Sequence, residues 1–144
     1  MNTPAKVRIE VTRDIATCLA LRRVVFIEEQ GVSEADERDD LDDAAVHLLA
    51  WVDGRAVGSA RLLTKGATGK IGRVCVLQDQ RGTGLGAALI GAAVEEFRGM
   101  AGIEVVKLGA QTHAIAFYEK LGFVAFGPEY DDAGIPHRDM MIDL

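Results

Sequence analysis

The chain has 144 residues, of which 49% are apolar and 26% are charged, a balance typical of one globular domain with a hydrophobic core. Its formal net charge of −6 argues against a general nucleic-acid binder, which would show a basic face, and favours cationic partners. No stretch is long and apolar enough for a membrane span, and the charged N-terminus lacks the apolar run of a secretory signal. We therefore expect a cytoplasmic protein that contacts neither membrane nor nucleic acid.

The two cysteines, Cys18 and Cys75, lie far apart and have no CxxC spacing. Neither a disulfide framework nor a zinc site is expected from them, and a reducing compartment is the simpler setting. The three histidines are scattered without the spacing of metal ligands, so no metal site is predicted.

The first part of the chain predicts a strand followed by a helix. Residues 7–12 are β-rich and alternate in polarity. Asp14 can cap a helix that continues to about Gln30, where Gly31 ends it. Residues 32–45 are polar and strongly acidic but lack the pattern of a calcium-binding EF-hand loop, so we expect a solvated loop.

A β-hairpin and a central strand are expected next. Residues 46–52 and 55–64 are apolar, β-rich runs joined by Asp53-Gly54, a dipeptide that favours a tight type I′ turn. A glycine-rich turn leads to a strand at 71–77 with apolar residues on both faces, a pattern typical of a strand covered on both sides.

The second half of the chain alternates between helix and strand. Because a strand, a helix and a second strand follow one another, they predict a right-handed parallel unit. The expected elements are a helix over 85–100, a strand at 105–110, a short helix from Thr112 to Gly122, and closing strands at 123–126 and 137–144 around an irregular loop. Together they predict one mixed α/β domain over residues 1–144.

The segment between the predicted strand at 71–77 and the helix is rich in glycine. Backbone N–H groups at a helix N-terminus, with the helix dipole behind them, favour an anion such as phosphate. Glycines would let the anion approach the backbone without a Cβ clash, although many glycine turns only permit tight packing. A P-loop is excluded, because Gly66–Ile71 fails its spacing and its last residue. The dinucleotide fingerprint is met by Gly82, Gly84 and Ala87, but the acidic residue it needs is not well placed.

Three ordered motifs carry a resemblance to a known family. Arg81-Gly82-Thr83-Gly84-Leu85-Gly86 resembles the R/Q-x-x-G-x-G/A pyrophosphate motif of the GNAT superfamily of N-acetyltransferases. The preceding Val74-Cys75-Val76 resembles the family's apolar strand, and residues 111–123 resemble its N-x-x-A-x-x-[LF]-Y-x-K-x-G-F segment, with Gln111 in place of Asn. Residues 25–30 and 134–137 resemble the small ElaA-like and YjcF-like bacterial members.

The resemblance implies a mixed, mostly antiparallel sheet whose central parallel strand pair is splayed for coenzyme A, with helices on both faces. It implies acetyl-CoA as a cosubstrate, direct transfer of the acetyl group in a ternary complex, and a possible homodimer. The residues expected to bind acetyl-CoA are Val74, Cys75, Val76, Arg81, Gly82, Thr83, Gly84, Leu85, Gly86, Gln111 and Phe117.

The same resemblance singles out catalytic candidates. Tyr118 is expected to act as the general acid, because a phenol of pKa about 10 can protonate a leaving thiolate whose thiol has a pKa of about 8.5. The strand acid that serves some members as base is missing here, and Glu29 is the candidate that replaces it. His137 is a candidate for the wall of the acceptor site, and an ordinary salt bridge is expected for Arg73.

The acceptor itself stays open. We expect a small-molecule or peptide amine, bound in a pocket built from the 20–45 region and the 126–138 loop, because specificity resides in variable loops. The alternative function is a non-catalytic acyl-CoA-binding or regulatory module that kept the cofactor site and lost turnover.

Overall fold

The expected strands pair into a seven-stranded sheet in this computed structural model, which describes residues 6–144. The strands are β1 (Val7–Thr12), β2 (Val46–Val52), β3 (Arg55–Lys65), β4 (Thr68–Val76), β5 (Val105–Gln111), β6 (Val124–Asp132) and β7 (Ile135–Asp143). Their order in the sheet is β1-β2-β3-β4-β5-β7-β6, and neighbours are antiparallel except for the parallel pair β4 and β5. The predicted fold class is confirmed.

The helices begin and end where local signals place them. Asp14 caps the first helix by accepting a hydrogen bond from the Thr17 N–H at 3.1 Å, and Gly31, with a φ of 74°, follows its end. The helical segments are α1 (Ile15–Arg22), its π-helical continuation η1 (Arg23–Glu29), α2 (Glu34–Glu37), η2 (Asp42–Ala44), η3 (Gln78–Gln80), α3 (Leu85–Arg98), η4 (Thr112–Ala114) and α4 (Ile115–Lys120). Among the described residues, no helix is long and apolar enough to cross a membrane.

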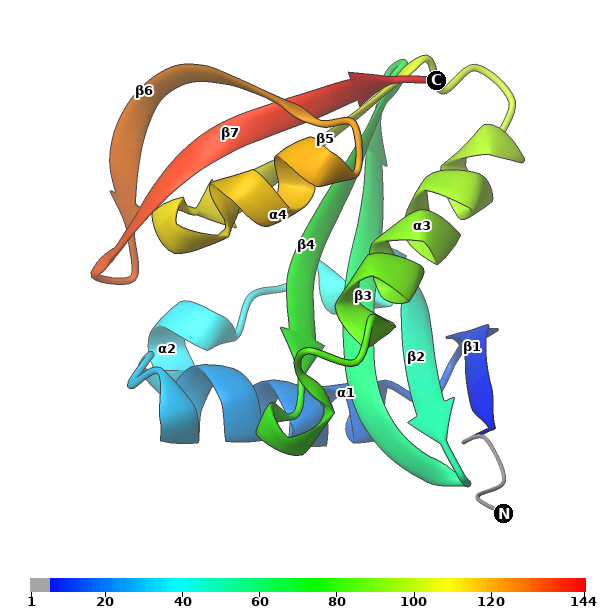
Figure 1. The fold of residues 1–144 in the computed structure, drawn as a ribbon, viewed down its shortest axis with the longest axis vertical. Coiled ribbons are helices and arrows are strands. Elements are labelled where there is room, and N and C mark those ends of the chain that lie inside the picture. The colour runs from blue at the N-terminus through cyan, green and yellow to red at the C-terminus, as the bar shows by residue number, and fades with distance from the viewer. Residues whose placement is uncertain (1–5) are drawn as a thin grey trace.

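Helices cover both faces of the sheet (Figure 1). On one face α3 and α4 enclose the larger apolar cluster, which includes Leu89, Phe97 and Met140. On the other face α1 covers a smaller cluster that includes Cys18 and Cys75. The alternation of side chains along each strand therefore supplies two cores, as the apolar residues on both faces of the 71–77 strand predicted.

The parallel pair is open along half of its length. Pairing between β4 and β5 runs from Thr68↔Val105 only to Ile71↔Leu108. Just beyond this point Arg73 has a φ of 48°, and the register between β3 and β4 shifts, which marks a β-bulge. The two strands then diverge, as Figure 1 shows, and leave backbone groups of 72–76 and 109–111 without strand partners across the gap. Buried backbone groups of this kind require a hydrogen-bond partner.

Two expectations for irregular segments are wrong. Residues 127–136 are not an irregular loop, because β6 and β7 form a long hairpin that turns at Ala133 and Gly134, with φ values of 53° and 81°. Alanine has no preference for positive φ, so Ala133 does not indicate a tight turn. Proline is unfavourable inside a sheet, so Pro136 does not indicate a strand. Residues 32–45 are not a solvated loop either, since they contain α2 and η2 and bury Glu37.

Glycine at position 69 is required by packing rather than by backbone conformation. A Cβ added to Gly69 would lie 2.6 Å from the ring of Phe97, a residue of α3 that is fully buried and cannot move aside. We expect Gly69→Ala to lower the free energy of unfolding by about 1–3 kcal/mol through overpacking. Urea denaturation would measure this, with Gly72→Ala as the control, because a Cβ at Gly72 meets nothing within 4 Å. Equal stability of the two variants would contradict the prediction.

Candidate active site

The glycine turn before α3 presents unpaired N–H groups at one end of the gap. Gly82 and Gly84 have φ values of 77° and 87°, and a Cβ at either would meet nothing within 4 Å. Within residues 6–144, the N–H groups of 82–87 donate no hydrogen bond, whereas the Ala88 N–H already bonds to the Gly84 carbonyl. The Thr83 hydroxyl donates to the Gln80 carbonyl at 2.6 Å and so holds the turn. The turn therefore has the geometry of an anion site at a helix N-terminus.

Arg81, at the start of this turn, is brought together with Glu29. Its Nε donates to the Val76 carbonyl at 3.1 Å, and its two terminal nitrogens form a bidentate pair with the Glu29 carboxylate, with Nη2 2.8 Å from Oε1. The hydrogen bonds from Arg81 lower the pKa of Glu29 below its ordinary value. A carboxylate with a lowered pKa is a weaker base, and the role of Glu29 in catalysis stays a prediction.

The three residues of the apolar strand motif point in different directions. Val74 and Val76 pack against the α3 side of the sheet. Cys75 is buried on the α1 side, where its Sγ lies 3.3 Å from the Ser59 hydroxyl and burial raises the pKa of the thiol. A contact of Cys75 with a ligand in the gap would therefore use its backbone rather than its sulfur.

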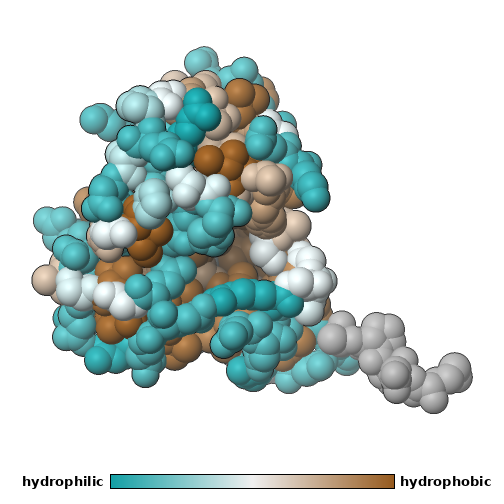
Figure 2. Space-filling model, turned by 60° about the vertical axis from the view of Figure 1, so that its left-hand side comes forward, coloured by the Kyte–Doolittle hydropathy of each residue, from teal (hydrophilic) through white to brown (hydrophobic). Residues whose placement is uncertain are grey.

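A cavity of about 340 Å³ opens on the gap between β4 and β5. Figure 2 shows this hollow between the two halves of the molecule, with apolar side chains in its floor and polar ones around it. Its walls come from two segments far apart in the chain, 26–41 and 130–137, together with β4 and β5. These are the segments from which the sequence predicted the acceptor pocket, and the structure places both at this cavity.

Tyr118 of α4 reaches the same cavity. Its ring packs edge-to-face between Phe117, at a centroid distance of 5.0 Å, and Phe123, at 6.0 Å. Burial raises the pKa of Tyr118 to about 12, so the phenol keeps its proton at neutral pH. Its hydroxyl makes no hydrogen bond with the described residues and is free to donate to a ligand. Phe117 lies beside the glycine turn, since a Cβ at Gly86 would be 3.5 Å from its ring.

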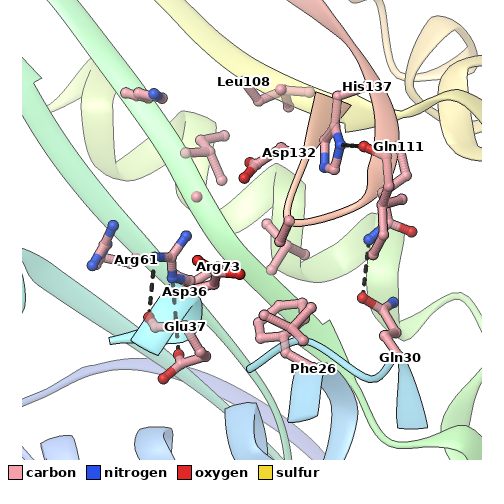
Figure 3. A pocket seen from close by; sticks show the side chains of 18 of the residues that line it. Phe26, Gln30, Asp36, Glu37, Arg61, Arg73, Leu108, Gln111, Asp132 and His137 are labelled. Carbon is pink, nitrogen blue, oxygen red and sulfur yellow. Dashed lines mark hydrogen bonds and ion pairs between the residues drawn. The ribbon is translucent and has the colours of Figure 1, made fainter. Parts of the chain in front are cut away.

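Gln111, at the end of β5, links two sides of the cavity. Its Nε2 donates to Oε1 of Gln30 at 3.1 Å, and its Oε1 lies 2.7 Å from Nε2 of His113. The first of these bonds ties the end of β5 to the residue that follows η1 (Figure 3). The amide that replaces the family's Asn is therefore at the open end of β5, as the motif places it.

Sequence reasoning missed a network of arginine and acidic side chains on the opposite wall of the cavity (Figure 3). Its members are Arg22, Glu37, Asp39, Asp42, Arg61 and Arg73. Arg22 and Glu37 are buried and bonded to each other, and Arg22 Nη1 lies 2.7 Å from Asp42. One feature of the sequence could have indicated the network: Arg22 is a cation on the same apolar helical stripe as Cys18 and Val25.

The network continues from α1 to β4. Arg61 forms a bidentate pair with Asp39, with distances of 2.7 and 2.9 Å. Arg73 donates to the Glu37 carbonyl at 3.0 Å and to Asp39 at 3.2 Å, so its expected salt bridge is present. The bulge that opens the sheet at Arg73 is thus held against α2 by hydrogen bonds.

Asp39 makes the network sensitive to acid. Hydrogen bonds from Arg61 lower the pKa of Asp39 to about 2, below its unfolded value of about 3.9. Its contribution to stability is therefore complete above pH 4 and is lost as the pH falls toward 2. Because Asp39 is exposed and solvent screens its ion pairs, we expect the free energy of unfolding of the wild type to fall between pH 5 and 2 by only about 1 kcal/mol more than that of Asp39→Asn. Denaturant titrations at both pH values measure this, and parallel losses would contradict it.

The fold and the gap define a class. A mostly antiparallel sheet, opened between two parallel strands beside a helix N-terminus with unpaired N–H groups, is the architecture of an acyltransferase. The chain belongs to the GNAT acetyltransferase family, because the acetyltransferase (GNAT) domain of that family matches residues 23–144. It is accordingly an N-acetyltransferase of the GNAT type, and the family resemblance is confirmed.

Several individual proteins are similar to this chain over most of its length. The chain is 40% identical to YyaT of Bacillus subtilis over 133 residues, which cover 90% of this chain and 89% of that protein. It is 38% identical to the N-acetyltransferase YjcF of the same organism over 124 residues, covering 85% and 88%. The crystal structure of Escherichia coli ElaA superposes with a TM-score of 0.81 at 29% identity, covering 96% and 99%. A Bacillus subtilis acetyltransferase solved in complex with CoA shares the fold, with a TM-score of 0.75 at 20% identity and coverage of 96% and 99%.

Proposed function

We propose that the protein transfers an acetyl group from acetyl-CoA to a primary amine within a ternary complex. The observation that carries this proposal is the continuity of three features: the unpaired N–H groups of 82–87, the unpaired edges of β4 and β5, and the cavity beyond them. A pyrophosphate, a pantetheine chain with its amides and an amine acceptor need these three environments in this order. A related fold that was solved with CoA supports the assignment of the cosubstrate.

The chemistry of the gap suits transfer from a thioester. Pantetheine amides would pair with those backbone groups of 72–76 and 109–111 that have no partner across the gap. A backbone N–H aimed at the thioester carbonyl would stabilise the tetrahedral intermediate, which is typically worth about 10²–10³ in rate. Tyr118 would donate its proton to the leaving sulfur. Burial raises the pKa of this phenol, and the same desolvation raises the pKa of a thiol placed beside it. The two pKa values therefore rise together, and the difference between them stays small.

The cofactor site is tested by calorimetric titration of acetyl-CoA into wild type, Gly84→Glu and Gly102→Glu. The glutamate at position 84 puts bulk and negative charge where the pyrophosphate would lie. Gly102 is the matched control, because it has a φ of 84° and open space, like Gly84, but follows the other end of α3. We expect wild type and Gly102→Glu to bind acetyl-CoA but not NADH, and Gly84→Glu to lose binding. Equal binding by the two folded variants would refute the site.

The acceptor class is tested by release of the CoA thiol in the presence of amines. A screen with kanamycin, spermidine, glucosamine, tyramine and a short peptide represents the classes that the sequence leaves open. We expect at least one amine to accelerate thiol release. Binding of acetyl-CoA without turnover on any amine would favour the acyl-CoA-binding module instead.

A further inference from the structure

Transfer to an amine requires a base on the acceptor side of the gap. A lysine-like amine with a pKa of about 10.4 is neutral in roughly one molecule per 10³ at pH 7. Glu29 is engaged by Arg81 at the glycine turn, which weakens it for this role. A different side chain, His137 of β7, lies in the wall of the cavity itself, and its ring points into the cavity in Figure 3.

The hydrogen bonding of His137 decides which ring nitrogen is free. Its Nδ1 lies 2.7 Å from the carbonyl oxygen of Ile135, an atom that only accepts, so Nδ1 carries the proton. In the neutral ring Nε2 then has an unprotonated lone pair. This Nε2 makes no hydrogen bond with the described residues. His137 is therefore held by the chain in the tautomer that a base requires.

The orientation of the ring is held by a second set of contacts. The ring of Tyr130 stacks on His137 at a centroid distance of 5.8 Å and an interplanar angle of 23°. The Tyr130 hydroxyl donates to Asp139 at 2.8 Å, which anchors this ring in turn. A Cβ at Gly109 would lie 2.4 Å from the Tyr130 oxygen, so glycine in β5 makes room for the arrangement.

His137 and Tyr118 approach the gap from opposite faces of the sheet. His137 pairs in register with Gln111, whose amide reaches Gln30 on the α1 side, so His137 lies on that face as well. Tyr118 packs against the core on the α3 side. Both side chains line the cavity. An amine entering on one face and a thiolate leaving on the other would each find a proton-transfer group beside it.

We propose that Nε2 of His137 is the general base of the transfer. The bound ammonium gives one proton to Nε2, which releases it to solvent. The neutral amine nitrogen then attacks the thioester carbonyl carbon, a C–N bond forms, and the nitrogen gives a second proton to Nε2. The C–S bond then breaks, and the sulfur leaves as a thiolate that takes a proton from the Tyr118 hydroxyl. The proton on His137 returns to the tyrosinate through solvent, so the products are the amide and the CoA thiol. This assignment rests on the proposed acetyl transfer.

The other titratable and charged groups around the cavity bear on the charge of His137. They are Tyr130 and Asp132 of β6, Asp139 of β7, His113 of η4, Tyr118 of α4, Arg61 of β3, Lys70 and Arg73 of β4, and Asp36 and Glu37 of α2. Arg73 is bonded to α2 and Asp139 to Tyr130. Asp132 forms no ion pair with the described residues. A base must be unprotonated to accept the amine proton, so activity requires the neutral form of His137.

The test compares His137→Asn with wild type, using the amine that responds in the screen. Asparagine keeps an amide N–H for the Ile135 carbonyl but has no basic lone pair. We expect kcat/KM to fall about 10²–10⁴-fold while the Kd for acetyl-CoA stays unchanged. After correction for the neutral fraction of the amine, the wild-type profile should keep an acid limb that His137→Asn lacks. Glu129→Gln, an exposed position on the same hairpin, is the control.

A rescue experiment separates a base from a merely structural residue. Added imidazole should restore part of the rate of His137→Ala, because it can enter the space that the ring vacates. Wild-type rates in His137→Asn, or loss of activity without any change in pH profile and without rescue, would overturn the assignment. If the wild type itself transfers nothing to any amine, the proposed function fails first and the role of His137 fails with it.

Discussion

Arg22→Met is expected to lower the free energy of unfolding by about 3–5 kcal/mol, because it leaves a buried carboxylate without its partner. Arg22 is 1% exposed and Glu37 is 5% exposed, and the two side chains bond directly. The nearest remaining cation, Arg73 Nε, lies 3.8 Å from Glu37 Oε1. Methionine fills a similar volume, so the lost free energy of unfolding comes from the charge of Glu37 and not from a cavity.

The adjacent residue supplies the control. Arg23 pairs with Glu34 on the surface, where the side chains are 56% and 64% exposed, and Arg23→Met should cost less than about 1 kcal/mol. Urea denaturation at pH 7 measures both variants. A second test adds Glu37→Leu to Arg22→Met, which should recover much of the loss because neither member of the buried pair is then left without the other. Similar stability of Arg22→Met and Arg23→Met would show that the buried pair contributes little.

This network explains why part of the site could be predicted from the sequence and part could not. The glycine turn and the Asp53-Gly54 hairpin depend on backbone conformations that few residues adopt. Both turns can therefore be predicted from a few consecutive residues. The bonds of Arg22 with Glu37 and Asp42 span 15 and 20 residues. An acidic run with no visible partner was therefore taken as solvated, whereas arginines of α1, β3 and β4 neutralise it in the fold.

The gap between β4 and β5 also could not be predicted from local sequence. Alternating apolar residues predicted the strands, but the point where they separate depends on the bulge at Arg73, a residue with no intrinsic preference for a φ of 48°. Its conformation is held by the bonds to Glu37 and Asp39 within one wall of the cavity. The pairing of Glu29 with Arg81, 52 residues apart, was likewise beyond any local pattern. Tertiary contacts therefore decide which candidate base is unpaired: Glu29 is bonded to Arg81, whereas Nε2 of His137 has no hydrogen-bond partner among the described residues.

A large effect on catalysis is expected from Tyr118→Phe. The substitution removes one hydroxyl and keeps the ring between Phe117 and Phe123. Because that hydroxyl bonds to none of the described residues, stability and the Kd for acetyl-CoA should stay close to wild type. A general acid contributes about 10²–10⁴-fold, and kcat should fall by this factor if the hydroxyl protonates the leaving sulfur. Steady-state thiol release with a responsive amine gives the measurement, and Glu119→Gln, the exposed next residue, is the control.

The pH dependence distinguishes this role from packing. Since burial raises the pKa of Tyr118 to about 12, the acid form persists throughout pH 7–10, and the wild-type rate should show no loss from its deprotonation in that range. An alkaline limb that disappears in Tyr118→Phe would mean that the phenol ionises much earlier than its surroundings indicate. A wild-type kcat in Tyr118→Phe would instead mean that the thiolate leaves without a proton from the protein. The separation of acid and base across the sheet would then not be needed, and His137 alone would carry the proton transfer.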